Sequence, residues 1–250
     1  PHLGASTVEA KKGVSRVISE QIRDYLLDSK LANAINMPIS NMSLLNDIKP
    51  FLKLGELLGD IISQLNDDSI IKIVIECQGS AEELRPISLA VLKGILSPNL
   101  PDRVNYINAE TIAKELGLDV QSIYTLGKTN YNNIISLTVI TGSNSYRIDG
   151  SIFDDNRPRL VNILGRDMEV NPKGNMLLIE NMDVPGVIGQ VGTFLGNRKI
   201  NIAAYLLNRA SQDGMAFSVI RIDNEIEEND LQSLRELDGI SWAEKIIVDI

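Results

Sequence analysis

The sequence predicts an α+β protein in which a leading helix is followed by two regions that mix helices and strands. Three observations support this prediction: an apolar stripe at helical spacing near the start, β-branched runs alternating with helical patterns through the middle, and a strand–helix–strand–strand–helix–strand order at the end. The chain has 250 residues, 44% of them hydrophobic, a length that suits one large domain or two ordinary domains and is ample for a real core.

The first 38 residues contain one predicted helix and a connector. Residues 6–9 read Ser-x-x-Glu, the pattern of a capping box, and predict the helix start. The helix is expected to end near Asp28, and residues 33–38 lead away from it to Pro38, which disfavours a helical conformation just before it. Apolar residues recur along one face of this helix at Val14, Ile18, Ile22 and Leu26.

A mixed region is expected from residue 39 to residue 172. Pro50 opens an amphipathic helix that runs to Leu65, and Asn108 caps a short helix over residues 109–116. The remaining predicted elements are a helix over 87–96 and strands over 70–76, 134–140, 145–153, 159–163 and 166–170, with a hairpin turn at 141–144 and a bend at Gly165.

The clearest region covers residues 173–250. Its predicted elements are strands over 176–180, 200–209, 214–223 and 243–250, and helices over 187–196 and 229–237. This βαββαβ order is that of the ferredoxin-like split β-α-β unit. The fold hosts many activities, so function has to be argued from sites.

Charge and cysteine content exclude several classes of protein. The net charge of −9 argues against a nucleic-acid-binding or anionic-membrane surface, because either would need a basic face. The single cysteine, Cys77, excludes a disulfide framework and a metal site made of this chain's cysteines alone, and we expect no metal. No apolar run reaches membrane-spanning length and no signal peptide is visible, so we expect a soluble cytoplasmic protein.

The most informative local motif is Asp183-Val-Pro-Gly186, between a predicted strand and a predicted helix. The unpaired amides at a helix start attract a carboxylate, and Asp183 beside them would hold an ammonium group, so the motif suits an amino-acid zwitterion. The alternative is a tight turn in which Asp183 caps the helix. Asn201, which offers a donor and an acceptor at a strand edge, either belongs to such a site or serves only as turn chemistry.

Basic residues and the lone histidine allow more than one interpretation. Arg157, Arg159 and Arg166 gather in an otherwise acidic chain, with Arg221 in a later strand. They form either a solvated face or a small-anion site. His2, the only histidine, has no visible partner and by itself indicates no role. Its place at the very start suggests that the chain is the C-terminal piece of a longer protein.

Taken in order, these motifs resemble the long form of D-3-phosphoglycerate dehydrogenase. Residues 1–7, together with residues 33–36, resemble the closing segment of that family's catalytic core. Residues 39–172 resemble its intervening, allosteric substrate-binding domain, through residues 51–56, 104–117 and 150–153. The first predicted helix would then be the terminal helix of a Rossmann-type core that is otherwise missing.

The last region resembles an ACT domain, a regulatory module of the same family. Residues 173–250 carry this part of the resemblance, with Asp183-x-Pro-Gly186 and Asn201-Ile202 as the most diagnostic pieces. The resemblance therefore covers essentially the whole chain and divides it into 1–38, 39–172 and 173–250.

The resemblance implies an NAD-dependent oxidoreductase as the parent protein. His2 matches the family's catalytic acid/base, and Gly4 would lie near the nicotinamide of NAD. The parent would oxidise 3-phosphoglycerate to 3-phosphohydroxypyruvate in L-serine biosynthesis. Because the NAD-binding domain is missing, this chain alone is expected to be inactive.

The resemblance also implies feedback control by L-serine. Asn181, Asp183 and Asn201 fall on effector-binding positions, and the amides of Val187 and Ile188 would hold the serine carboxylate. Serine would lie between two ACT domains from different subunits, which implies a homodimer or homotetramer. Serine would then bias the assembly toward an arrangement in which the catalytic cleft cannot close, with residues 33–38 as the hinge.

A second implied site binds an anion or the phosphorylated substrate in the intervening region. Arg159 and Arg221 match two of its basic positions, whereas Asn171 stands where a third basic residue is expected. Lys173 is near enough in sequence to substitute.

Two other functions stay open. The chain could be a stand-alone amino-acid-sensing protein, or the small subunit of an iron–sulfur L-serine dehydratase. The segment around His2 weighs against both, because neither has a use for a catalytic motif.

Overall fold

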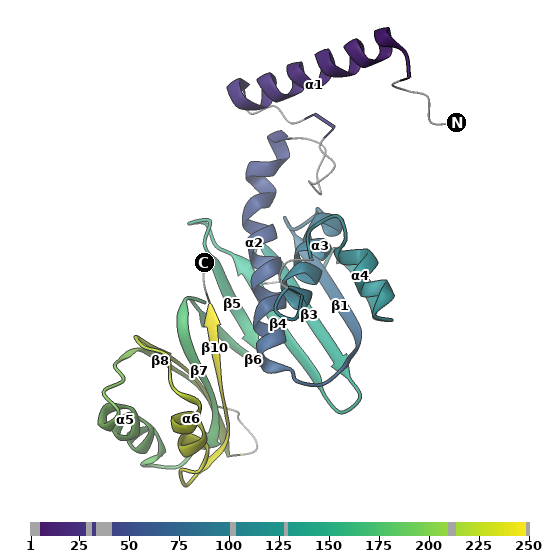
Figure 1. The fold of residues 1–250 in the computed structure, drawn as a ribbon. Helices are drawn as coiled ribbons and strands as arrows, with labels where there is room; N and C mark the ends of the chain where they lie inside the picture. The colour runs from purple at the N-terminus through teal and green to yellow at the C-terminus, as the bar shows by residue number, and fades with distance from the viewer. Residues whose placement is uncertain are drawn as a thin grey trace.

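A computed structural model of the chain describes residues 6–28, 32–33, 42–100, 104–127, 130–209 and 214–248. After the first helix, two lobes follow along the chain (Figure 1). The first lobe comprises residues 42–170 and the second lobe residues 174–248. Each lobe is a sheet with helices on it, so the predicted α+β class is confirmed.

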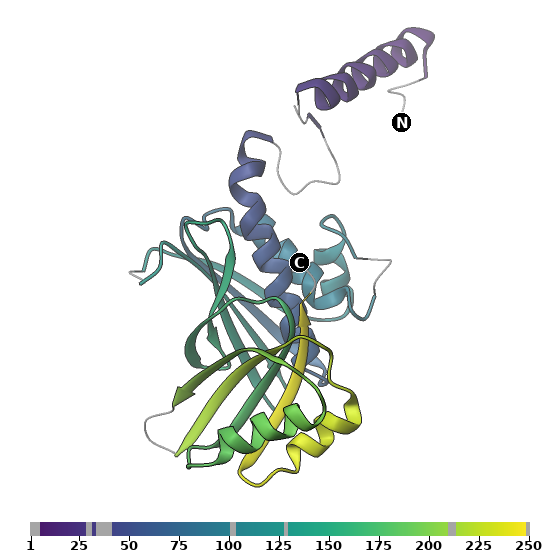
Figure 2. The same ribbon diagram turned by 90° about the vertical axis from the view of Figure 1, so that its left-hand side faces the viewer.

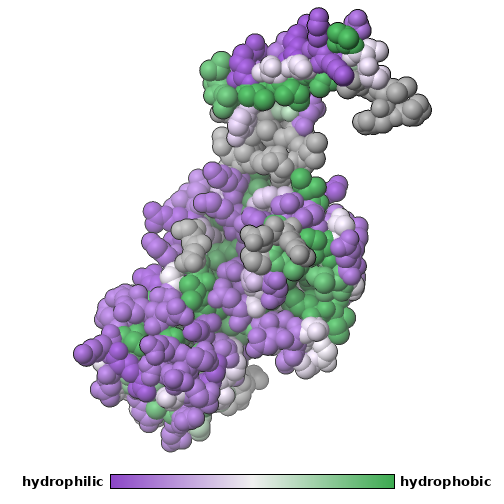
Figure 3. Space-filling view, in the orientation of Figure 1, coloured by the Kyte–Doolittle hydropathy of each residue, from purple (hydrophilic) through white to green (hydrophobic). Residues whose placement is uncertain are grey.

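The leading helix α1 (Val8–Asp28) ends where the sequence predicts but begins at a different cap. The hydroxyl oxygen Oγ1 of Thr7 accepts a hydrogen bond from the amide of Ala10 at 3.1 Å, so Thr7 takes the capping role expected of Ser6. The helix buries none of its residues. Its predicted apolar stripe is exposed, and apolar side chains gather along one side of it (Figure 3).

The first lobe contains a six-stranded sheet in the order β2-β1-β3-β4-β5-β6. Only β1 and β2 run parallel, and every other neighbouring pair is antiparallel. The strands are β1 (Ile70–Gly79), β2 (Asp119–Thr125), β3 (Asn133–Thr141), β4 (Ser145–Ile152), β5 (Pro158–Ile163) and β6 (Arg166–Val170). Strand β2 has no counterpart in the sequence prediction, because most of its residues are exposed and it lacks the apolar alternation of a half-buried strand.

Helices α2 (Met42–Leu65), α3 (Leu84–Leu96) and α4 (Ala109–Glu115) complete the first lobe. The prediction that Pro50 opens the first of them is wrong, since α2 begins eight residues earlier. Ile48 and Leu52 on either side of Pro50 are buried in one cluster with Ala90 of α3. Their burial favours a continuous helix despite the hydrogen bond that Pro50 cannot make.

The sequence predicts the first residue of α4 correctly, but it does not predict which group the Asn108 side chain binds. Asn108 occupies the N-cap position without a side-chain hydrogen bond to the helix. Its Oδ1 instead accepts from the amide of Asn105 at 2.7 Å. The Asn108 side chain therefore stabilises the preceding turn rather than the helix.

The second lobe has the predicted ferredoxin-like topology. Its four-stranded antiparallel sheet has the order β10-β7-β9-β8, with β8 and β10 at the edges. The elements are β7 (Gly174–Met182), α5 (Val187–Asn197), β8 (Ile202–Arg209), β9 (Met215–Ile222), α6 (Glu228–Arg235) and β10 (Ile240–Val248). Alternate residues such as Leu177 and Ile179 share a core with α5 and α6.

The two lobes share one hydrophobic core. Residues of the second lobe that point away from α5 and α6 join the buried cluster of the first lobe: Met176, Leu178, Phe217, Val219, Ile246 and Val248. Gln64 of α2 binds the backbone of Ile247 in β10, donating to its carbonyl at 2.9 Å and accepting from its amide at 2.8 Å. Figure 2 shows β10 running beside α2. This contact covers one edge of the second sheet and ties the lobes together.

None of the described helices is long and apolar enough to cross a bilayer.

Candidate functional site

The turn between β7 and α5 presents an uncapped helix start. Gly186 is the N-cap residue with a φ of 106°, a conformation that suits glycine, and no side chain caps the helix. Two backbone hydrogen bonds of 2.8 Å fix the turn. The amide of Met182 donates to the carbonyl of Gly239, and the amide of Asp183 donates to that of Gly214. The first amides of α5, at Val187 and Ile188, therefore have no side-chain cap, as at helix starts that bind a carboxylate.

Asp183 does not cap this helix, so the capping alternative is wrong. Its Oδ2 lies 3.3 Å from Nε of Arg209, the last residue of β8. Sequence reasoning did not find Arg209, because only the sheet order brings the end of β8 to the same end of the sheet as the end of β7, with β9 between them. The turn thus carries one carboxylate, one guanidinium and an uncapped helix start, a combination that matches both charges of an amino acid.

Asn181 supports the turn from inside. Its side chain is buried, and Nδ2 donates to the carbonyl of Met182 at 2.8 Å. In one chain it therefore orients the residue before Asp183 instead of projecting toward solvent.

Asn201 lies at the opposite end of the second sheet from Asp183. Its Nδ2 donates to Oδ2 of Asp223 at 2.7 Å, just beyond the end of β9, whereas Asp183 pairs with Gly214 just before the start of β9. The eight residues of β9 span roughly 26 Å at the usual rise per residue. One chain therefore does not bring Asn201 and Asp183 together.

A separate cavity of about 280 Å³ lies where the lobes meet and contains both predicted anion-binding arginines. Arg159 of β5 and Arg221 of β9 line it with Asn171, as the sequence predicts for one site. Lys173 is exposed and does not line the cavity, so it does not replace the missing basic residue. The other lining residues are Glu169, Val170, Ala204, Leu206 and Val219.

The two arginines in this cavity have different surroundings. Arg159 is held in place, with Nη1 3.0 Å from the carbonyl of Pro158 and Nη2 3.4 Å from Oδ2 of Asp155. Its guanidinium also lies 5.5 Å from the centre of the Phe153 ring. Arg221 makes no ion pair within the described residues. Its charge is therefore available to a ligand.

Glu169 is a lining residue of this cavity that sequence reasoning missed. Its Oε1 accepts a hydrogen bond from the hydroxyl of Tyr131 at 3.2 Å. Partial burial is the larger cause and this hydrogen bond the smaller cause of a raised pKa of Tyr131. The phenol therefore stays protonated and keeps donating to Glu169. With two guanidinium groups and one carboxylate, the cavity carries one net positive charge.

The other arginines of the basic group serve structural contacts. Arg157 is exposed with Nε 3.8 Å from Asp155, which fits the solvated-face interpretation. Arg166 forms an ion pair with Glu180 across the two lobes and lies 5.7 Å from the Phe217 ring. Neither lines the cavity of Arg159.

His2 and Gly4 lie outside the described residues, and the helix start after β7 does not fit NAD. The glycines that follow β7 are Gly186, Gly189 and Gly192, whose spacing differs from that of a dinucleotide-binding loop. The carboxylate of Asp183 also precedes the same helix start, where it would repel a pyrophosphate.

Among the described residues, no cluster of three His, Cys, Asp or Glu side chains could hold a metal ion.

Comparisons with known proteins point to one family. The model of the D-3-phosphoglycerate dehydrogenase intervening domain matches residues 47–164. The D-3-phosphoglycerate dehydrogenase of Synechocystis sp. is 32% identical over 97% of this chain. Those of Methanocaldococcus jannaschii and Bacillus subtilis are 32% and 29% identical over 96%. Over nearly its whole length, this chain is therefore similar in sequence to D-3-phosphoglycerate dehydrogenases.

The chain spans less than half the length of these dehydrogenases: 44% of the Synechocystis protein and 46% of the other two. The intervening-domain match begins inside α2 and ends at Leu164, just before β6. Since β6 completes the same sheet, the structural unit extends at least to Val170. The dehydrogenase resemblance thus extends well beyond the matched domain, through the second lobe.

Proposed function

We propose that this chain is the regulatory and oligomerisation portion of a cytoplasmic D-3-phosphoglycerate dehydrogenase. Residues 39–172 would form its intervening domain and residues 173–250 its ACT domain, after the end of the catalytic core at 1–38. The parent enzyme would oxidise 3-phosphoglycerate with NAD, and L-serine would be the feedback effector. The relatives along the whole chain support this proposal.

The observation that carries the effector assignment is the division of the candidate site into two halves. One half holds Asp183, Arg209 and the first amides of α5, and the other holds Asn201 at the far end of the sheet. A two-fold axis would place the Asn201 half of one copy against the Asp183 half of another, because isologous contacts are reciprocal. We therefore infer a homodimer that binds two serine molecules.

Serine binding would use the charges of this turn directly. The amides of Val187 and Ile188 would hold the carboxylate, with Arg209 nearby as a second positive group. Asp183 would exchange its exposed contact with Arg209 for the ammonium group of serine. An exposed ion pair contributes little stability, so this exchange has a small energetic cost.

The cavity of Arg159 and Arg221 would bind the phosphorylated substrate as an allosteric ligand. Arg221 and the oriented Arg159 supply charge-assisted hydrogen bonds for phosphate or carboxylate oxygens. The cavity lies in the contact between lobes that share one core, so a ligand there can favour one arrangement of the lobes. Coupling of about 1–3 kcal/mol between this cavity and the serine site would be ordinary for such a system.

Calorimetric titration of L-serine into the 250-residue chain tests the effector assignment. We expect saturable binding that is lost in Asp183→Ala. Asp230→Ala is the matched control, because it also removes an aspartate paired with an arginine of the second lobe, Arg198 at 2.5 Å, but away from the turn. Absence of heat at millimolar serine, with a folded dimer confirmed by sedimentation, would refute the effector assignment.

A further inference from the structure

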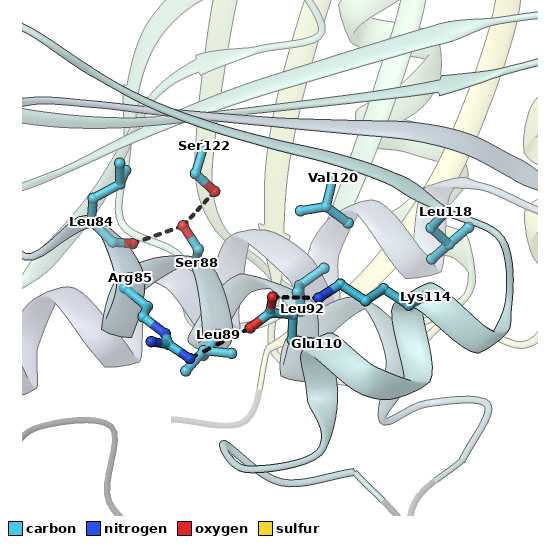
Figure 4. Close-up of a pocket in the computed structure, with 10 residues that line it drawn as sticks. All are labelled: Leu84, Arg85, Ser88, Leu89, Leu92, Glu110, Lys114, Leu118, Val120 and Ser122. Atoms are coloured by element: carbon cyan, nitrogen blue, oxygen red, sulfur yellow. Dashed lines mark hydrogen bonds and ion pairs between the residues drawn. The ribbon is translucent and has the colours of Figure 1, made fainter.

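A third pocket lies in the first lobe, away from both sites described above. It is bounded by α3, α4 and the edge strand β2 and has a volume of about 550 Å³, within the range of small-molecule sites (Figure 4). Its lining contains no residue of the serine half-sites or of the arginine cavity. The function proposed above leaves this pocket unused.

The interior of the pocket is mostly apolar. Five aliphatic side chains line it: Leu84, Leu89, Leu92, Leu118 and Val120. The polar groups inside are the hydroxyls of Ser88 and Ser122, which lie 2.8 Å apart and join α3 to β2. Because Ser88 donates to the carbonyl of Leu84 at 2.7 Å, the hydroxyl pair is satisfied without a ligand. The interior therefore suits an aliphatic group.

The rim of the pocket carries two cations and one carboxylate. Nζ of Lys114 lies 2.9 Å from Oε1 of Glu110, in a hydrogen-bonded pair along α4. Arg85 of α3 reaches Oε2 of the same carboxylate only at 3.7 Å, and its side chain is 82% exposed. The hydrogen bond from Lys114 lowers the pKa of Glu110, so the carboxylate stays charged and already has a partner. Because Arg85 is largely exposed and its contact with Glu110 is long, its guanidinium is the cation at this rim that can more easily turn to an anion.

We propose that this pocket binds a small aliphatic monocarboxylate, with its hydrocarbon chain between α3 and β2 and its carboxylate on Arg85. Apolar surface is visible on this flank of the first lobe (Figure 3). The net rim charge of one positive unit matches a monoanion and stands out in a chain of net charge −9. A phosphate or nucleotide would not bury the aliphatic side chains that line the pocket.

The direct test is calorimetric titration of octanoate into the 250-residue chain. Saturable binding is expected, and butanoate should bind more than a hundredfold more weakly because four buried methylene groups are missing. Arg85→Gln should weaken octanoate binding about three- to fivefold, the usual worth of an exposed charge pair. Arg157→Gln, which changes an exposed arginine outside the pocket, is the control and should leave binding unchanged.

Two variants that fill the pocket locate the binding site. Val120→Trp and Ser122→Leu should each abolish octanoate binding, and circular dichroism should show that the variants are folded. Absence of octanoate binding to the natural chain, or full binding to both folded variants, would overturn the proposal. Binding of 1-octanol as tight as that of octanoate would overturn the carboxylate assignment. Serine binding is measured separately, so failure of either proposal leaves the other intact.

Discussion

At the scale of single residues, Cys77 shows how burial alone determines chemistry. It lies in β1 with no exposed surface and belongs to the main core cluster. Burial raises the pKa of its thiol to about 12, because the thiolate would be desolvated there. The sequence interpretation of Cys77 as a small buried hydrophobe is therefore confirmed.

We expect the Cys77 thiol to be inert in the folded protein. At pH 8 a thiol-specific disulfide reagent should modify less than a tenth of the chains in an hour, since almost no thiolate is present and access is blocked. Addition of denaturant should expose one reactive thiol per chain. Rapid modification of the folded protein would contradict the burial of β1.

Alkaline pH should destabilise the fold through the same group. The thiol pKa is raised from its ordinary value of 9.0, so its contribution to stability is complete below pH 9 and is lost as pH rises toward 12. Urea titrations should show the free energy of unfolding falling by about 1.4 kcal/mol per pH unit in that window. The pKa of Tyr106 is also raised, mainly by burial, so this residue adds to the loss of stability above pH 10. A Cys77→Ala variant that keeps the full slope at pH 9–10 would contradict this account.

At the scale of elements, two glycines set the distance between α2 and α3. A Cβ on Gly94 would lie 2.1 Å from the carbonyl oxygen of Glu56, and one on Gly59 would lie 2.4 Å from that of Val91. Both obstacles are backbone atoms, which cannot move without separating the helices. Glycine at these positions is therefore required by packing.

Gly94→Ala should destabilise the protein by about 1–3 kcal/mol or more, because the helices must move apart. Gly192→Ala is the matched control: Gly192 is also helical, in α5, and nothing lies within 4 Å of an added Cβ. The control should gain about 0.5–1 kcal/mol from helix propensity. Urea unfolding measures both changes. Equal stabilities of the two variants would show that α2 and α3 are not in the described contact.

The same scale shows what sequence patterns can predict. The hairpin of β3 and β4 and the whole second lobe follow from alternation, turn residues and helical spacing, which are local. Strand β2 was missed because an exposed edge strand has no apolar alternation to reveal it. The start of α2 was missed because burial against α3, a long-range effect, outweighs the local signal of Pro50.

At the scale of the whole molecule, the two lobes are joined by a shared core. Their shared core and the double hydrogen bond of Gln64 to Ile247 join elements far apart in sequence. We therefore expect a single unfolding transition in urea. Fluorescence of Trp242, the one tryptophan, reports on the core that the lobes share, because Trp242 packs against that cluster, whereas far-ultraviolet circular dichroism reports on the secondary structure of both lobes. Two separated midpoints would contradict a shared core.

The candidate sites were predictable only in part, for reasons that belong to this largest scale. Asp183 and Gly186 were visible because their chemistry lies within four residues. Arg209 and Glu169 were not, because sheet order and lobe packing bring them to their sites. The separation of Asn201 from Asp183 likewise became visible only from the position and length of β9. This separation is the reason why the proposed serine site requires a second copy of the chain.

The most direct test of this shared site is calorimetric titration of L-serine into a mixture of two variants that are each expected not to bind serine. Asp183→Ala and Asn201→Ala should each fail to bind as homodimers. Mixed dimers would combine both defects in one site and leave the other intact, so an equimolar, re-equilibrated mixture should recover about a quarter of the natural stoichiometry. No recovery, with mixed dimers demonstrated by mass spectrometry, would contradict a site shared between two copies.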